Sequence, residues 1–158
     1  MTSITRSGAY TESKLLKPFY LILLFIMGLT GFGQMPIFKR YYIADIPGLG
    51  WLADFYATHY IHYIGAIVLF TFFTYVTVIY WGLMRRQFQL TWAAYFRISL
   101  LVLIAVTGIF RVLKNLPDVV FSPLFTLVVD ISHLAFMMFL MIFGILFMIL
   151  RKGWLVRK

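Results

Sequence analysis

The sequence contains no cysteine and few charged residues, and both shortages narrow what the protein can be. Without cysteine there can be no disulfide, no thiolate nucleophile, no iron–sulfur ligation and no covalently attached haem. Only 12% of the 158 residues are charged, against about 25% in an average soluble domain. So few charges cannot cover the surface of a small soluble fold. A soluble globular protein is therefore excluded.

The chain is instead 63% hydrophobic, and these residues gather in four long runs. Each run has the roughly 20 residues that a membrane-crossing helix needs. The sequence thus predicts an all-α integral membrane protein, a four-helix transmembrane bundle with a long loop between helices 1 and 2. We expect a single domain over 1–158, with helices at about 18–38, 58–84, 92–114 and 119–150. Any soluble catalytic centre is then expected on another subunit.

The net charge of +9 does not indicate nucleic acid, because the basic residues form short clusters between apolar runs. Such clusters set the orientation of membrane helices, with the excess facing the cytoplasm. Ten basic residues fall on the side of the termini and four on the other, so we expect both termini in the cytoplasm. The ten are Arg6, Lys14, Lys17, Arg85, Arg86, Arg97, Arg151, Lys152, Arg157 and Lys158, and the four are Lys39, Arg40, Arg111 and Lys114. Arg97, inside an apolar run, is expected to extend to the headgroups.

A weak internal repeat divides the chain in two. The first run ends with Thr30-Gly31 and leads to His62, and the third ends with Thr107-Gly108 and leads to His133. The spacing from glycine to histidine is 31 residues in the first half and 25 in the second. Chance similarity between apolar segments is the competing explanation. If the repeat is real, His62 and His133 are equivalent residues.

The three histidines lie in apolar sequence, where ionisable groups are costly and usually functional. Two imidazoles on neighbouring helices are typical of a bis-histidine haem. His59 and His62 are one turn apart and cannot bind opposite faces of one porphyrin, so the repeat favours His62 with His133. A histidine that only hydrogen-bonds another helix remains an alternative. Zinc fits less well, since it needs more ligands than these.

Other residues near the same end of the predicted helices suit a haem. Glycines on helices 1 and 3 would let a flat macrocycle approach the backbone. Cations would neutralise the haem propionates. The residues with these two roles are Gly31 and Gly108 for clearance, and Lys39, Arg40, Arg111 and Lys114 for charge.

His59 and Asp130 each precede a proposed ligand by three residues, which places them about one helical turn nearer the membrane surface. Reduction of a quinone consumes two protons with two electrons, so a quinone site needs titratable groups at the aqueous edge. His59 and Asp130 are the candidates for this protonation. In the alternative interpretation, Asp130 only holds His59 or accepts a hydrogen bond from a ligand imidazole.

The four-helix layout, the histidines of helices 2 and 4 and the Thr-Gly halves resemble the small b-type cytochrome subunits of membrane oxidoreductases, such as the gamma subunit of respiratory formate dehydrogenase and the cytochrome b of nickel–iron hydrogenase. Those relatives generally hold two haems, with further histidines on helices 1 and 4 that this chain lacks. The resemblance therefore implies one haem b. It also implies electron exchange between a peripheral iron–sulfur or cytochrome subunit and the quinone pool.

The leading hypothesis is a haem b membrane anchor of a respiratory oxidoreductase complex in the inner membrane of a prokaryote. Its partners would be membrane lipid, quinone and a peripheral redox subunit, with no nucleic acid and no catalytic activity of the subunit alone. A small transporter or proton-conducting subunit that uses the His/Asp cluster is the alternative. A passive anchor is a third possibility, for which clustered histidines would be unnecessary.

Overall fold

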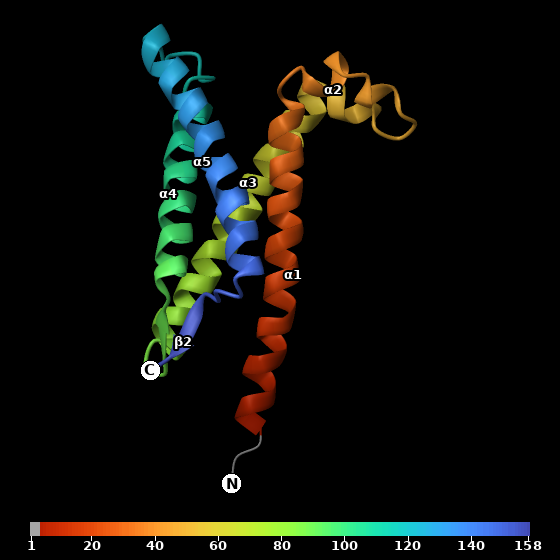
Figure 1. The fold of residues 1–158 in the computed structure, drawn as a ribbon. Helices are drawn as coiled ribbons and strands as arrows, with labels where there is room; N and C mark the ends of the chain where they lie inside the picture. Colours follow the sequence, from red (N-terminus) through yellow and green to blue (C-terminus); the bar gives the residue numbers. More distant parts are fainter. Residues whose placement is uncertain (1–3) are drawn as a thin grey trace. The chain divides into compact units, whose positions relative to one another are not determined.

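The computed structural model describes residues 4–158, and describes side chains from residue 15 onward. Arg6 and Lys14, which entered the count of basic residues, lie outside the described side chains. The chain divides into two compact units, residues 1–79 and 80–158, and each is described by itself. Both are built on a hairpin of two long helices (Figure 1).

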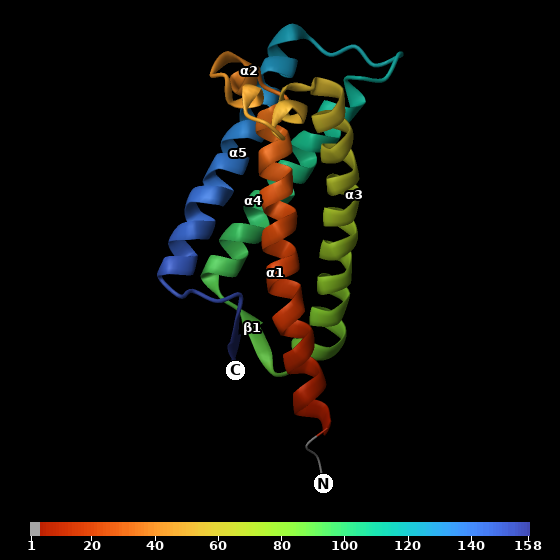
Figure 2. The ribbon, with the colours of Figure 1, turned by 90° about the vertical axis from the view of Figure 1, so that its right-hand side faces the viewer.

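The first unit pairs α1 (Ile4–Gly33) with α3 (Phe55–Ile79), which run antiparallel in both views (Figures 1 and 2). Their connection folds into the short helix α2 (Ile37–Arg40) and two 3₁₀ turns, η1 (Ile43–Asp45) and η2 (Gly50–Ala53). α1 ends before Pro36, which cannot donate to a continuing helix. Asp54 is the N-cap of α3, because its Oδ1 accepts hydrogen bonds from the backbone N–H groups of Tyr56 at 2.9 Å and of Ala57 at 3.1 Å.

Glycine allows α1 and α3 to approach closely at two levels. A Cβ added at Gly33 would lie 2.7 Å from Cγ2 of Thr58, which is fully buried. A Cβ added at Gly65 would overlap the thioether sulfur of Met27. Small residues at a helix interface are the usual way for membrane helices to gain packing contacts. These contacts bring the histidines of α3 against the end of α1.

The second unit pairs α4 (Trp92–Leu113) with α5 (Pro123–Ile149), again antiparallel (Figure 1). Hydroxyl side chains cap both helices. Thr91 Oγ1 accepts from the backbone of Ala94 at 3.1 Å, and Ser122 Oγ accepts from Phe125 at 3.3 Å. Pro123 follows Ser122 at the first helical position, where its missing N–H has no cost.

A small sheet joins the two ends of the second unit. After the π-helical turn η3 (Tyr80–Met84), strand β1 (Phe88–Leu90) pairs antiparallel with β2 (Leu155–Arg157), with Gln89 opposite Val156. Beside it, the Arg97 guanidinium donates through Nη2 to the Lys152 carbonyl at 2.7 Å. The expectation that Arg97 extends to the headgroups is wrong, since this residue is only 6% exposed. Its hydrogen bond and two aromatic rings hold it inside the unit.

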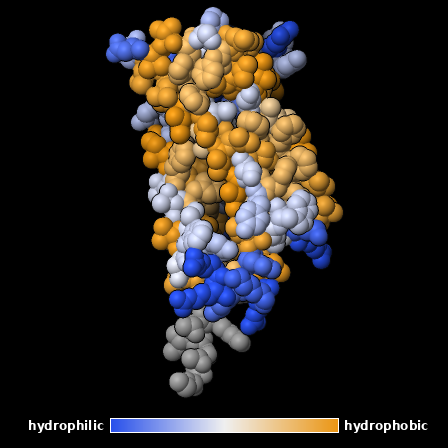
Figure 3. Space-filling model, turned by 90° about the vertical axis from the view of Figure 1, so that its left-hand side faces the viewer, coloured by the Kyte–Doolittle hydropathy of each residue, from blue (hydrophilic) through white to orange (hydrophobic). Residues whose placement is uncertain are grey.

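Four helices are long and apolar enough to cross a membrane. Large hydrophobic side chains are exposed along all of them, and apolar residues cover most of the face shown in Figure 3, with hydrophilic residues gathered toward its ends. In water such a surface would be prohibitive, whereas lipid solvates it directly. The predicted all-α class with four membrane-crossing helices is confirmed, and the chain is a multi-pass membrane protein in contact with lipid.

Three of the four predicted helices need corrected bounds. The first helix extends toward the N-terminus beyond 18 and ends at Gly33 instead of 38. The second begins at Phe55 instead of 58, because Asp54 caps it. The fourth begins at Pro123 instead of 119, because Ser122 is its cap. The predicted third helix, 92–114, agrees with α4 to within one residue.

Candidate functional site

His62 lies on α3 and faces the end of α1 in the first unit. Its Nδ1 is 3.0 Å from Oγ1 of Thr30, a side chain with no exposed surface. The next residue, Gly31, leaves space for the ring, since a Cβ there would lie 3.4 Å from Cε1 of His62. The imidazole edge therefore rests directly on the Thr-Gly pair of α1.

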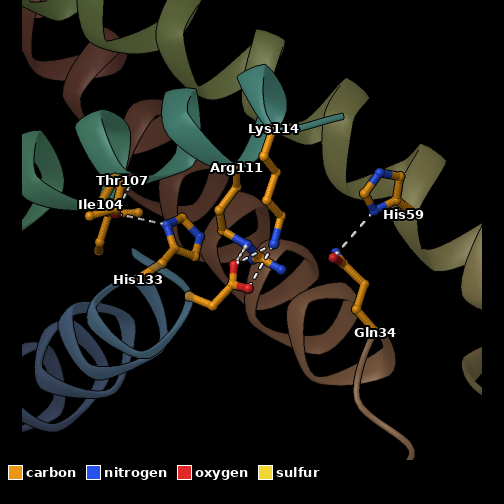
Figure 4. Close-up of polar contacts among 8 residues, drawn as sticks. Gln34, His59, Ile104, Thr107, Arg111, Lys114 and His133 are labelled. Carbon is orange, nitrogen blue, oxygen red and sulfur yellow. Dashed lines mark hydrogen bonds and ion pairs between the residues drawn. The ribbon is translucent and has the colours of Figure 1, made fainter. Parts of the chain in front are cut away.

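His133 has the same surroundings in the second unit. Its Nδ1 is 3.0 Å from Oγ1 of Thr107 on α4, and a Cβ added at Gly108 would lie 3.3 Å from its Cε1. Figure 4 shows the ring pointing at Thr107, and the imidazole is also hydrogen-bonded to the backbone of Ile104. Each hairpin thus presents one half-buried imidazole, held by a threonine and a glycine of the preceding long helix.

The repeat indicated by the sequence corresponds to the same set of contacts in both hairpins. Within each hairpin the same two ring atoms, Nδ1 and Cε1, meet the same two residue types at distances that agree within 0.1 Å. The expectation for Gly31 and Gly108 was clearance for a macrocycle. In the structure, the side of each glycine that lacks a Cβ faces the imidazole ring. The glycines therefore leave space for the histidine rings. We call the threonine and glycine that contact one imidazole its seat.

Asp130 lies one turn before His133 on α5 and pairs with two cations of α4. Its carboxylate accepts from Arg111 Nε at 3.0 Å and from Lys114 Nζ at 2.8 and 2.7 Å (Figure 4). The carboxylate is about a third exposed, so solvent screens these ion pairs. Among these three residues there is one more positive than negative charge. This cluster, Arg111, Lys114 and Asp130, is called the cation cluster below.

His59 lies one turn before His62 on α3 and has a partner that the sequence did not suggest. Its Nδ1 is 3.3 Å from Oε1 of Gln34 (Figure 4). Its ring also stacks on Phe55, with the ring centroids 5.2 Å apart. Gln34 Nε2 donates in turn to the Thr30 carbonyl at 3.5 Å. Because the Gln34 amide nitrogen donates to the Thr30 carbonyl, the amide oxygen is the atom that faces His59. His59 therefore donates a hydrogen bond to this oxygen.

A pocket of about 190 Å³ opens beside Gln34, where α1 meets the connection to α3. Of its lining residues, only Gln34 and Lys39 have polar side chains. Arg40, the other basic residue expected there, lies in α2 and is exposed. The pocket is lined by Gly33, Gln34, Met35, Pro36, Lys39, Ala53 and Phe55.

The chemistry of these groups fits a haem better than a bare metal ion. Haem iron is ligated by neutral imidazoles, which are best placed by a hydrogen bond at the second ring nitrogen. His62 and His133 both have that bond. Among the residues whose side chains are described, no group of three or more histidines and carboxylates could hold a metal ion, so the zinc alternative gains no support.

Sequence reasoning did not identify Gln34 and the two threonines as contacts of the histidines. The threonines had a signal, because each one precedes the repeated glycine by one residue. Gln34 had a weaker signal, as a polar residue just beyond the apolar run of α1.

Comparisons with protein-family models, with curated proteins and with solved structures found no match to this chain.

Proposed function

We propose that the protein is a haem b subunit that exchanges electrons between a peripheral iron–sulfur or cytochrome subunit and the quinone pool, in the inner membrane of a prokaryote. His62 and His133 would be the axial ligands of a single haem. When bound, the haem would supply a one-electron carrier, which no side chain of this chain can replace. The chain itself would orient the ligands, set their basicity and exclude water.

The observation that carries this proposal is the repeated seat of the two imidazoles. A histidine kept only for helix packing has no reason to recur with the same threonine at Nδ1 and the same glycine at Cε1 in a second hairpin. Two equivalent, hydrogen-bonded, neutral nitrogen donors suit the two axial positions of six-coordinate haem iron. The membrane setting supplies the low dielectric around such a site.

The test is the reduced-minus-oxidised absorption spectrum of the full chain purified in mild detergent, together with its electron paramagnetic resonance. Sharp α and β bands on reduction, with the rhombic signal of bis-imidazole ferric iron, are expected. A haem whose ferric signal is high-spin would contradict ligation by two histidines.

The cation cluster supports a second part of the proposal. Arg111 and Lys114 retain one net positive charge after pairing with Asp130, and they lie at the His133 end of α4 and α5. A net positive charge there favours a carboxylate such as a haem propionate. Lys39 and Arg40 would do the same from the first unit. Asp130 then has a role in orienting Arg111 and Lys114, while its use as a proton carrier stays a prediction.

His59 supports the quinone side of the proposal. A quinone takes up two electrons and two protons to become a quinol, so a titratable group must reach its oxygens. His59 is half-buried, one turn from His62, and Gln34 and Phe55 connect it to the pocket beside α2. The amide and ammonium groups of that pocket are donors suited to a quinone oxygen.

Replacement of His59 by alanine is expected to leave the haem spectrum intact and to slow quinol-linked reduction of the haem at least tenfold, because a positioned acid or base is worth about 10²–10⁴-fold. Stopped-flow mixing with a water-soluble quinol measures this rate. The matched control is Tyr75→Phe, on the exposed surface of the same helix. Equal quinol kinetics in both variants would contradict a protonic role for His59.

The proposed orientation places both termini in the cytoplasm, on the basis of the ten-to-four distribution of basic residues. Reporter fusions after residues 45 and 88 test it. A reporter that is active only outside the cytoplasm is expected to work at 45 and to fail at 88. The reverse pattern would overturn the orientation and move the histidines toward the cytoplasmic half.

A further inference from the structure

The hydroxyl groups that touch His62 and His133 have only one hydrogen each, and the distances to their neighbours indicate which acceptor receives it. Thr30 Oγ1 lies 2.7 Å from the Ile26 carbonyl, four residues earlier on α1. Thr107 Oγ1 lies 2.8 Å from the Leu103 carbonyl in the same relation on α4. A carbonyl oxygen can only accept, so each threonine donates its hydrogen to its own helix.

A second carbonyl lies near each hydroxyl, Met27 at 3.3 Å and Ile104 at 3.0 Å, and can also only accept. The imidazole Nδ1, 3.0 Å from each hydroxyl oxygen, is then the group that supplies the hydrogen of its contact. A neutral imidazole has one N–H. With the proton on Nδ1, the lone pair is on Nε2.

We propose that Thr30 and Thr107 are positioning residues that hold the proton of His62 and His133 on Nδ1 and reserve Nε2 as the ligand atom. The neutral imidazole of free histidine favours the opposite tautomer, with the proton on Nε2, so the protein has to impose this one. The role in ligation rests on the proposed haem site. The tautomer does not, because the hydrogen bonds belong to the chain alone.

The glycines complete the seat. A ring that is hydrogen-bonded at one atom can still rotate about that bond, whereas contact at a second atom fixes its plane. Gly31 and Gly108 allow that second contact, at Cε1. The pair Thr-Gly thus controls both the ligand atom and the rotation of each imidazole. Substitution of valine for threonine removes the hydroxyl and keeps the side-chain volume, so it separates the hydrogen bond from the packing.

The experiment labels histidine with ¹⁵N in the full chain, reconstituted in lipid nanodiscs and reduced, and records the ring nitrogens by nuclear magnetic resonance. We expect an Nδ1–H proton at His62 and at His133. In Thr30→Val and Thr107→Val the corresponding Nδ1–H signal should shift and exchange rapidly with water. Haem affinity should fall about 10–100-fold, the usual effect of losing a group that orients a metal-bound histidine.

The midpoint potential of the haem is a second readout. Loss of packing alone would not shift this potential in a fixed direction. A hydrogen bond from Nδ1–H raises the basicity of the ligand and favours ferric iron. The valine variants should therefore have a higher potential than the wild type, and Thr30→Ser and Thr107→Ser should restore it. Two matched controls make the same bond to their own helix from exposed positions, Thr71→Val (Ile67 carbonyl, 2.9 Å) and Ser99→Ala (Tyr95 carbonyl, 3.0 Å).

Protonation at Nε2 in the wild type, or unchanged Nδ1–H signals and potential in the valine variants, would overturn this inference. Absence of haem alone would not overturn the tautomer assignment. A chain that contains no haem but keeps both Nδ1–H tautomers, sensitive to valine and restored by serine, supports the role of the threonines and refutes the proposed function.

Discussion

Replacement of either His62 or His133 by alanine is expected to abolish the low-spin haem spectrum. Under the proposed function, each substitution removes one of the two axial imidazoles of the haem. The threonine and the glycine that contact that imidazole then have no ring to orient. The absorption spectrum and the haem content of the purified variants measure the loss. Addition of free imidazole should restore the low-spin bands in part, because the alanine leaves room for it.

The matched control is His59→Ala, one turn away on α3. His59 contacts Gln34 in place of a threonine, and its neighbours in the structure are aromatic rings. This variant is expected to keep the haem. If His59→Ala loses the haem while His62→Ala keeps it, the assignment from the repeat is wrong by one turn. Far-ultraviolet circular dichroism of all three variants separates loss of ligand from loss of fold.

Replacement of Arg97 by methionine is expected to lower the free energy of unfolding by about 3 kcal/mol. The guanidinium donates to the Lys152 carbonyl at 2.7 Å and its central carbon lies 4.9 Å from the ring centroids of both Phe147 and Trp154. A hydrogen bond from a charged group contributes about 1.5–3 kcal/mol and a cation–π contact about 0.5–1 kcal/mol. Methionine keeps part of the volume and none of these interactions.

Unfolding of the purified chain in mixed micelles, followed by circular dichroism, measures this difference. Arg86→Met is the control, because it removes the same charge from an exposed position at the same end of the second unit. Equal transition midpoints for the two variants would show that Arg97 does not hold the segment after α5 to α4.

The fold class follows from the sequence because membrane helices are specified by composition and length, and both are local properties. The helix ends were harder to place. Their determinants are single residues, such as the cap Ser122 with Pro123 or the cap Asp54, which hydropathy does not distinguish from the rest of a loop. The two short strands were missed, because β1 and β2 are far apart in sequence and each has only three residues.

The candidate ligands were found because a histidine in an apolar helix is conspicuous. Their threonine partners were not identified, since a helical threonine ordinarily bonds its own backbone. Only the packing shows that the same oxygen also lies 3.0 Å from an imidazole nitrogen. Asp130 was associated with His59, whereas its described partners are Arg111 and Lys114. The short connection between α4 and α5 made these cations available, and hairpin geometry would have predicted the pairing.

Arg97 shows a different limit of sequence reasoning. An arginine near the end of an apolar run can extend to the headgroups or be buried against aromatic residues, and the two outcomes have the same local sequence. Burial of Arg97 depends on its contact with Trp154, which lies 57 residues later in the sequence, just before strand β2. Such long-range contacts are not encoded in a hydropathy pattern.

The central claim, one haem b held by two histidines of this chain, is tested most directly by pyridine haemochrome quantitation on the purified full-length protein. Haem is extracted into alkaline pyridine and identified as type b by its reduced spectrum. The molar amount of haem is then divided by the molar amount of protein from amino-acid analysis. The account predicts one haem b per chain. No haem would contradict it and favour the proton-conducting alternative, and two haems per chain would require ligands other than His62 and His133.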